Sequence, residues 1–293
     1  ASISPKYFYN KLGSKLFEAI TLLDEYYPTR TEAGIFESNY GNIARVIRQA
    51  GITNACLIDL GAGNCAKSAA LIPHLKPQQY VPVDISVDFL REAAGNLQAS
   101  FPLLDIVAVG LDFSSTLVLP TKVQDENRVF FYPGSSLGNF TPTEAQRFLQ
   151  QISNPAQGNA SGLLLGIDLV KDIAVLQGAY DDAPGVTAAF NKNMLLNLNG
   201  EFGTNFDLRQ WRHMALFNKQ ESRIEMHLDA LQDLTVRWDG ATRNFRRGES
   251  IHTENSYKYT PALFEAMLCE AGFSKVQQWR DPQDWFAVFL AQD

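Results

Sequence analysis

The feature that most constrains the fold is a short apolar segment that runs directly into two glycines. Residues 55–60 read ACLIDL and are followed at once by Gly61-Ala62-Gly63. An apolar run this short, ended by glycines, is typical of a buried strand that enters a tight turn. Residues 65–76 then have helical character, so this segment predicts a strand, loop and helix of the kind that build an α/β sheet.

The same alternation of strands and helices continues along the chain. SVDFLREAAGNL has helical spacing with Ser86 at its start, and TPTEAQRFLQQI opens with the Thr and Pro of a helix start. Strand-like segments surround these helices at 79–84, 104–109, 128–132 and 162–168. The alternation predicts a parallel, doubly wound α/β sheet.

The pattern changes after Asp168. The region 171–250 contains polar helices, and its segment RIEMHLDALQDLTVRW alternates like an antiparallel hairpin. The α/β pattern returns with the helix PALFEAMLCEAG, which ends at Gly272, and with two strand-like segments, SKVQQWRD and WFAVFLAQ. We therefore expect an α/β core formed by 31–170 and 259–293 and a second domain formed by 1–30 and 171–258.

Composition excludes several classes of protein. The 293 residues are 45% hydrophobic and 19% charged, which supports a sizeable core. The net charge of −7 disfavours a nucleic-acid partner, and no apolar stretch approaches the ~20 residues that cross a bilayer. The start of the chain does not read as a secretory signal, and three cysteines without a CxxC fit a reducing compartment. We expect a cytoplasmic protein with a small-molecule substrate.

Polar and glycine residues follow three consecutive strands at their carboxyl ends, where ligands bind in a doubly wound sheet. Gly61 and Gly63 allow close approach of the backbone to a ligand. Asp84 ends the second strand, where an acid can accept from ribose hydroxyls, and otherwise it caps a helix. After the third strand, Asp112 can accept from an adenine amino group and Phe113 can cover the ring. Together these residues predict a nucleoside-containing cofactor.

Two cofactors fit this pattern. Dinucleotide-binding loops favour G-x-G-x-x-G, and here the last position is Ala66, a variant that also occurs. No obvious pyrophosphate cradle follows, which favours S-adenosylmethionine (SAM), a molecule without phosphates. A dehydrogenase remains the alternative.

Several long segments carry a resemblance to a known family: YYPTRTE, LIDLGAGNCAKS, GSSLGNF, YDDAPGVTAAFN and IHTENSYKY. Over nearly the whole chain, the sequence closely resembles the histidine N-alpha-methyltransferases of ergothioneine biosynthesis. The resemblance implies a Rossmann-like class I SAM methyltransferase domain with an inserted α+β substrate-binding domain. It also implies three successive methylations of the α-amine of free L-histidine, which yield the betaine hercynine and S-adenosylhomocysteine.

The resemblance further implies roles for individual residues. Besides the residues found at the strand ends, it adds Tyr9 and Lys67 as cofactor contacts. The amino acid's amine and carboxylate would be positioned for catalysis by Tyr26, Asn139 and Tyr180. Its imidazole would be bound by Glu254, which can accept an N–H, and by Ser256, which can serve either ring nitrogen. Met226 would line the same pocket.

Each role has a purely structural alternative, such as a core position for Tyr26, a solvated helix face for Tyr180 and Lys67, or a pairing of Glu254 with Lys258. An enzyme for another amino acid, such as tryptophan or a modified tryptophan, remains open, as does a non-catalytic SAM-binding protein. We expect a monomer that has no membrane partner. No metal site is expected, because the four histidines lie far apart and without metal-ligand spacing.

Overall fold

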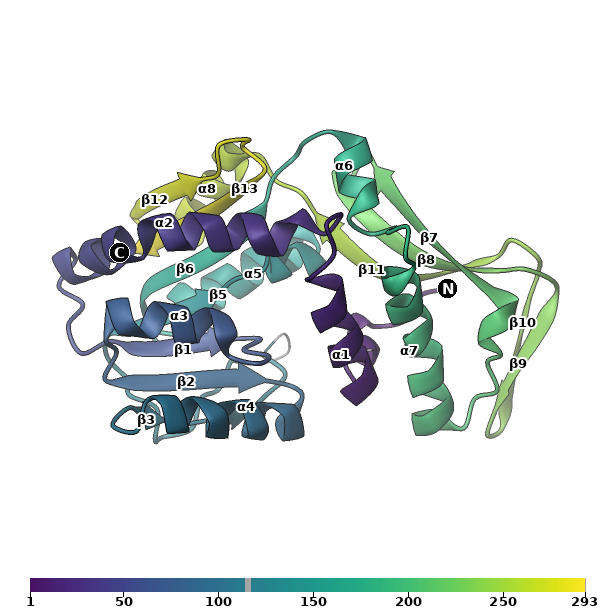
Figure 1. Ribbon diagram of the computed structural model, residues 1–293, viewed down its shortest axis with the longest axis horizontal. Helices are drawn as coiled ribbons and strands as arrows, with labels where there is room; N and C mark the ends of the chain where they lie inside the picture. The colour runs from purple at the N-terminus through teal and green to yellow at the C-terminus, as the bar shows by residue number, and fades with distance from the viewer. Residues whose placement is uncertain (114–116, 293) are drawn as a thin grey trace. The chain divides into compact units, whose positions relative to one another are not determined.

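The computed structural model describes residues 1–113 and 117–292, and the chain forms two compact units (Figure 1). Unit 1 comprises Ala1–Tyr27 and Lys171–Lys258, and unit 2 comprises Pro28–Val170 and Tyr259–Asp293. The two units divide after residues 27, 170 and 258, and the boundaries that the sequence predicts are 30, 170 and 258. The separate roles expected for the two units remain predictions.

Unit 2 is built on a mostly parallel sheet with the strand order β12-β13-β6-β5-β1-β2-β3, and β4 also pairs with β2. The strands are parallel except that β13 runs antiparallel to both β6 and β12. Their bounds are β1 Cys56–Leu60, β2 Gln79–Asp84, β3 Asp105–Ile106, β4 Val109–Gly110, β5 Arg128–Tyr132, β6 Ala160–Asp168, β12 Lys275–Arg280 and β13 Phe286–Gln292. The doubly wound α/β fold predicted from the sequence is confirmed.

The order of the strands reverses between β1 and β5, because the chain builds outward from β1 to β3 and then returns to the other side of β1. Such a switch point is where a doubly wound sheet leaves room for a ligand. Every residue of β1, β5 and β13 is buried, as expected for central strands covered on both faces.

Two helices of unit 2, α5 and α8, begin at capping signals in the sequence, whereas the side chain of Ser86 makes no capping hydrogen bond at the start of α4. Thr141 and Glu144 form a capping box at the start of α5, and Thr260 caps α8 through the amide of Leu263. The elements are α2 Tyr27–Gln49, α3 Ala66–Leu75, α4 Val87–Ser100, η2 Ser136–Asn139, α5 Pro142–Ser153 and α8 Pro261–Glu270.

The strand expected at 104–109 is interrupted. Its two parts, β3 and β4, pair with opposite ends of β2 and leave Val81 and Pro82 without a register partner on that side. Proline has no N–H to donate to a ladder, and its position in the gap gives a physical reason for the break.

Unit 1 combines the α-helices α1, α6 and α7 with an antiparallel sheet of order β11-β8-β7 and a separate hairpin of β9 and β10. Helix α1 packs against α7, as Figure 1 shows, and Trp211, Leu228 and Phe245 are buried in the core. The elements are η1 Pro5–Phe8, α1 Lys11–Ile20, α6 Ile173–Gly178, α7 Val186–Phe202, η3 Leu208–Gln210, β7 Trp211–Asn218, β8 Arg223–Ala230, β9 Leu234–Trp238, β10 Ala241–Phe245 and β11 Ser250–Tyr257.

The hairpin expected within RIEMHLDALQDLTVRW is wrong. The segment does form two strands, but β8 pairs with β7 and β11, whereas β9 pairs with β10. Alternation of apolar and polar residues sets the face that a strand buries and not the partner that it takes. In the part of the chain that the structure describes, we find no helix with the length and apolarity needed to cross a membrane.

Candidate functional site

The glycine loop after β1 adopts a backbone that favours glycine. Gly61 has φ +70° and Gly63 has φ +53°, both in the left-handed region. The amide of Gly63 donates to Asp84 Oδ2 at 3.0 Å, and the amide of Gly61 donates to the carbonyl of Val83 at 2.9 Å. The loop therefore holds Asp84, at the end of β2, directly beside it.

Asp84 is fixed at both carboxylate oxygens by backbone amides. Besides the Gly63 bond, its Oδ1 accepts from the amide of Ser86 at 2.9 Å. A carboxylate oxygen can accept more than one hydrogen bond, so an anchored carboxylate of this kind can still accept from ligand hydroxyls.

Phe113 lies beside the same loop. A Cβ built on Gly61 would be 3.9 Å from Phe113 Cζ. The Phe113 ring also makes an edge contact with Tyr132, with 5.7 Å between ring centroids, and a tilted contact with Phe148 at 5.9 Å. The preceding Asp112 is half-buried. The structure thus brings together the three sets of strand-end residues that the sequence singled out.

A buried carboxylate on β1 supports this loop from inside. Asp59 accepts from Ser68 Oγ at 2.5 Å and from Tyr80 OH at 2.8 Å, and so it ties β1 to α3 and β2. Burial raises the pKa of Asp59 to about 6, and the two hydrogen bonds oppose that rise.

A second buried carboxylate, Glu32 of α2, joins the loop after β5 to α3. Its side chain is 1% exposed, and Oε2 lies 2.5 Å from Lys67 Nζ. Its Oε1 accepts from the amide of Gly134 at 2.6 Å. The bond to Glu32 uses one of the three donors of the Lys67 ammonium group. The sequence interpretation missed Glu32, although it lies within YYPTRTE.

Asn139 is the last residue of η2, after two buried residues, Leu137 and Gly138. It is half-buried and belongs to unit 2, together with the expected cofactor residues on the strand ends and Lys67. The other expected substrate residues, Tyr26, Tyr180, Met226, Glu254 and Ser256, belong to unit 1.

Within unit 1, the hydroxyl of Ser256 lies at the centre of a polar cluster. Its Oγ is 2.8 Å from Tyr180 OH and 2.8 Å from Lys258 Nζ, which also donates to Tyr180 OH at 3.2 Å. The ring of Tyr180 meets the ring of Tyr26 edge-on, with 6.1 Å between centroids. Tyr180, Tyr26 and Ser256 are therefore brought together, as the predicted substrate roles require.

Glu254 lies on the same face of β11 as Ser256. It is directly opposite Met226 of β8 in the register, and both side chains are buried. Burial raises the pKa of the Glu254 carboxyl to about 7, and the positive charge of Lys258 partly opposes this rise. Glu254 is thus a buried acid that titrates near neutral pH.

A register shift between His252 and Glu254 decides which face these two residues occupy. Thr253 has no register partner, and its hydroxyl donates to the carbonyl of Met226 at 3.0 Å. Because of the shift, His252 pairs with His227 on the opposite face from Glu254, and the two imidazole rings stack at 4.7 Å.

Two histidines are therefore close in space, contrary to the sequence argument that all four lie apart. Glu225, His227 and His252 could together offer ligands to a metal ion. We assign no metal to them, because Glu225 Oε2 already contacts His227, and Oε1 accepts from Asn218 and Arg223.

Tyr9, expected to contact the cofactor, lies in unit 1 within an aromatic cluster. Its ring is 6.4 Å from Phe8, 6.1 Å from Phe17 and 5.9 Å from Phe190, measured between centroids. Tyr9 is half-buried, and its role as a cofactor contact stays a prediction.

His213 holds the backbone of Tyr180. One ring nitrogen, Nδ1, lies 2.8 Å from the side-chain amide of Asn191, and Nε2 lies 2.8 Å from the carbonyl of Tyr180. Because the carbonyl can only accept, Nε2 carries the proton and Nδ1 accepts from Asn191. Burial lowers the pKa of His213, which favours this neutral form. No signal in the sequence marks this role.

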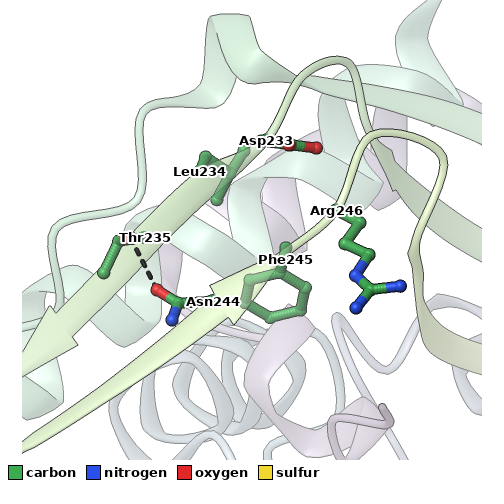
Figure 2. Close-up of a pocket in the computed structure, with 6 residues that line it drawn as sticks. All are labelled: Asp233, Leu234, Thr235, Asn244, Phe245 and Arg246. Carbon is green, nitrogen blue, oxygen red and sulfur yellow. Dashed lines mark hydrogen bonds between the residues drawn. The ribbon is translucent and has the colours of Figure 1, made fainter.

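A surface hollow of about 240 Å³ lies on the β9–β10 hairpin (Figure 2). Its lining residues are Asp233, Leu234, Thr235, Asn244, Phe245 and Arg246. None of the expected site residues borders it, and Thr235 donates to Asn244 across the hairpin at 2.7 Å. We assign it no part in the chemistry.

The fold and the strand-end residues define a class of protein. A doubly wound sheet that ends in the antiparallel strand β13, with a glycine loop after β1 and an acid after β2, is the Rossmann-like arrangement of class I SAM methyltransferases. Comparison with known proteins narrows this class.

Over residues 1–293 the chain matches the family described as histidine-specific methyltransferase, SAM-dependent. It is 40% identical to the histidine N-alpha-methyltransferase of Mycolicibacterium smegmatis, over 99% of this chain and 90% of that protein. It is 29% identical to ergothioneine biosynthesis protein 1 of Neurospora crassa, over 97% of this chain and 32% of that protein. A solved SAM-dependent methyltransferase from Clostridium acetobutylicum is also similar, with 14% identity, a TM-score of 0.47 and 96% coverage of each chain.

The chain therefore belongs to the family of histidine-specific, SAM-dependent methyltransferases. It is an enzyme that uses SAM.

Proposed function

We propose that this protein transfers three methyl groups, one after another, to the α-amine of free L-histidine, with hercynine and S-adenosylhomocysteine as products. The observation that carries this proposal is the buried pair of Glu254 and Ser256 on one face of β11. A carboxylate and a hydroxyl side by side suit a ring that has one N–H and one bare nitrogen. The name of the mycobacterial relative supports the same substrate.

The strand-end residues of unit 2 fit the cofactor. The two glycines leave their loop without side chains, and both oxygens of Asp84 are held in place by amides so that they can accept from ribose hydroxyls. We assign Phe113 to the face of the adenine and Asp112 to its amino group.

The charged end of the cofactor is assigned to Lys67, and Tyr9 is assigned as a further contact. Glu32 neutralises part of the Lys67 charge and fixes its position. When bound, SAM supplies a methyl group made electrophilic by its positively charged sulfur.

Neutral groups suit the methyl-accepting amine. The amine must present a free lone pair, and a strong salt bridge to a carboxylate would hold it protonated. Tyr26, Tyr180 and Asn139 can position the amino acid through hydroxyl, aromatic and amide groups. The faces of the two tyrosine rings also favour the cationic ammonium that forms with each methylation.

An indole side chain fits this pocket poorly. It offers one N–H and no bare ring nitrogen, so Ser256 would lose its ligand partner. A site whose buried polar groups are left unpaired rejects such an analogue. Histidine is therefore favoured over tryptophan.

The test compares Glu254→Ala and Ser256→Ala with the exposed control Glu201→Ala. We expect each pocket variant to lose about 10- to 100-fold in kcat/KM for histidine, as for a buried hydrogen-bond partner that is removed. Affinity for SAM, measured by calorimetry, should stay the same in all three. The assignment would be overturned if the pocket variants methylated histidine as well as the wild type does, or if the wild type preferred tryptophan.

We also propose that the protein is a monomeric, cytoplasmic enzyme. Cys56 and Cys65 are buried and Cys269 is exposed, and all three are free thiols, which supports a reducing compartment. Light scattering across a concentration series tests the monomer, which requires a constant mass near 32.6 kDa.

A further inference from the structure

Lys258 is a buried cation beside the hydroxyl that we assign to the imidazole. It is 2% exposed, and its ammonium group donates to Ser256 Oγ at 2.8 Å and to Tyr180 OH at 3.2 Å. It also lies over the Tyr180 ring, 5.0 Å from the centroid. Lysine is almost never fully buried unless its charge is compensated, so this placement calls for a role.

The contacts of Lys258 determine what Ser256 can offer to a ligand. An ammonium group only donates, so one lone pair of Ser256 Oγ is used by Lys258. Of the two hydroxyls, the phenol is the more acidic and thus the better donor, so Tyr180 donates to Ser256 across their 2.8 Å contact. Both lone pairs of Oγ are then occupied, and Ser256 presents its hydrogen.

An acid and a base share this face of the sheet. Glu254 and Lys258 lie on it. The apolar residues Met226 and Ile224 of β8 lie opposite Glu254 and Ser256 of β11. His213 of β7 is also on this face, in its neutral form, 4.0 Å from Asp181. Arg223, Glu225, His227 and His252 lie on the opposite face of the same strands.

We propose that Lys258 is a specificity-determining residue that makes the pocket select a neutral ring, one with an N–H for Glu254 and a bare nitrogen for Ser256. The inference rests on the proposed function and deepens it. An imidazolium ion has two N–H groups and no bare nitrogen, so one N–H would meet the hydrogen of Ser256 and the charge of Lys258. Glu254 alone would favour that ion, because a charge-assisted bond is stronger than a neutral one. Lys258 removes this preference.

The test separates ring charge from ring shape. Affinities of histidine and of 1,2,4-triazol-3-ylalanine are measured by calorimetry with saturating S-adenosylhomocysteine, at about pH 7.5 and about pH 5.5. The triazole keeps an N–H and a bare nitrogen but stays neutral throughout. Protonation of Glu254 changes the affinities of both ligands, so its effect largely cancels in the ratio of the two affinities. The ratio also does not depend on the fraction of protein that is folded.

In the wild type, the ratio of histidine affinity to triazole affinity should fall about tenfold at the lower pH, because imidazole has a pKa of about 6.5. In Lys258→Met this fall should shrink to less than about twofold. The exposed control Lys219→Met should behave like the wild type. Two results overturn the inference. One is a wild-type affinity ratio that does not change with pH, which counts even if Lys258→Met does not fold. The other is a folded Lys258→Met protein whose affinity ratio falls as much as that of the wild type. Absence of histidine binding at about pH 7.5 in the wild type contradicts the proposed function itself.

Discussion

Glu254 illustrates at the scale of one residue how a binding group can oppose stability. Burial raises the pKa of its carboxyl from 4.5 to about 7, so the folded protein holds this proton more tightly than the unfolded chain does. Between these two pKa values, the free energy of unfolding therefore falls as the pH rises. The carboxylate that we assign to the imidazole N–H is thus costly to bury above neutral pH.

We predict that Glu254→Gln raises the free energy of unfolding at about pH 8, by up to about 3 kcal/mol, and weakens histidine binding. The gain should fall to about 0.4 kcal/mol near about pH 4.5, where the wild-type residue is protonated in the folded protein and half protonated in the unfolded chain. Urea unfolding at the two pH values measures this, with Glu201→Gln as the exposed control. A variant that is less stable than the wild type at about pH 8 would show that the Glu254 charge is compensated in the fold.

Single residues were predictable from the sequence where a local pattern carries the role. The glycine loop, Asp84 and Phe113 follow strands that can be read directly from apolar runs. Glu32 and His213 could not be assigned in this way, because their partners are 35 and 33 residues away in the chain. The same holds for Lys258, whose contact with Tyr180 spans 78 residues.

At the scale of an element, strand β6 carries two glycines with different surroundings. A Cβ on Gly166 would lie 1.8 Å from Glu32 Oε1, whereas the nearest atom to a Cβ on Gly162 is 3.6 Å away. The absence of a side chain at Gly166 thus makes room for the carboxylate that holds Lys67 and the loop after β5.

We predict that Gly166→Ala lowers the free energy of unfolding by about 1–3 kcal/mol, as for overpacking of a core, and weakens SAM binding. Gly162→Ala, on the same strand, should change stability by much less and leave SAM binding intact. Chemical unfolding and calorimetry measure both effects. Equal losses in the two variants would mean that the space beside Glu32 does not matter for the cofactor.

Elements were predictable where their boundaries depend on neighbouring residues. Strands β1, β2 and β5 and the capped helix α5 have local signals, and the structure contains them. The break between β3 and β4 depends on pairing with β2, and the partners of β8 and β9 depend on distant strands. His252 and Glu254 are two residues apart, a spacing that normally places both side chains on one face of a strand. The register shift between them puts Glu254 on the other face, and the sequence does not reveal that shift.

At the scale of the whole molecule, each unit has its own buried core. The expected cofactor residues other than Tyr9 are in unit 2, and most expected substrate residues are in unit 1. A ligand that binds only the folded form stabilises the segments that it contacts. Each ligand should therefore protect a different set of amides.

We predict that S-adenosylhomocysteine slows hydrogen exchange mainly at 59–67 and 84–86. Histidine, added to that complex, should slow it at 254–258 and around Tyr180. Hydrogen exchange followed by mass spectrometry maps both sets, with the β9–β10 hairpin as an internal control that should not change. Protection of the hairpin alone by histidine would move the substrate site to the hollow there.

The most direct measurement of the central claim is a competition among substrates. The wild-type protein is incubated with SAM and an equimolar mixture of the twenty amino acids, and the products are identified by mass spectrometry. The account predicts that histidine alone gains mass, in steps of one methyl up to three, with all three on the α-nitrogen. Methylation of tryptophan or another amino acid in preference to histidine would contradict it, as would a mixture left unmodified.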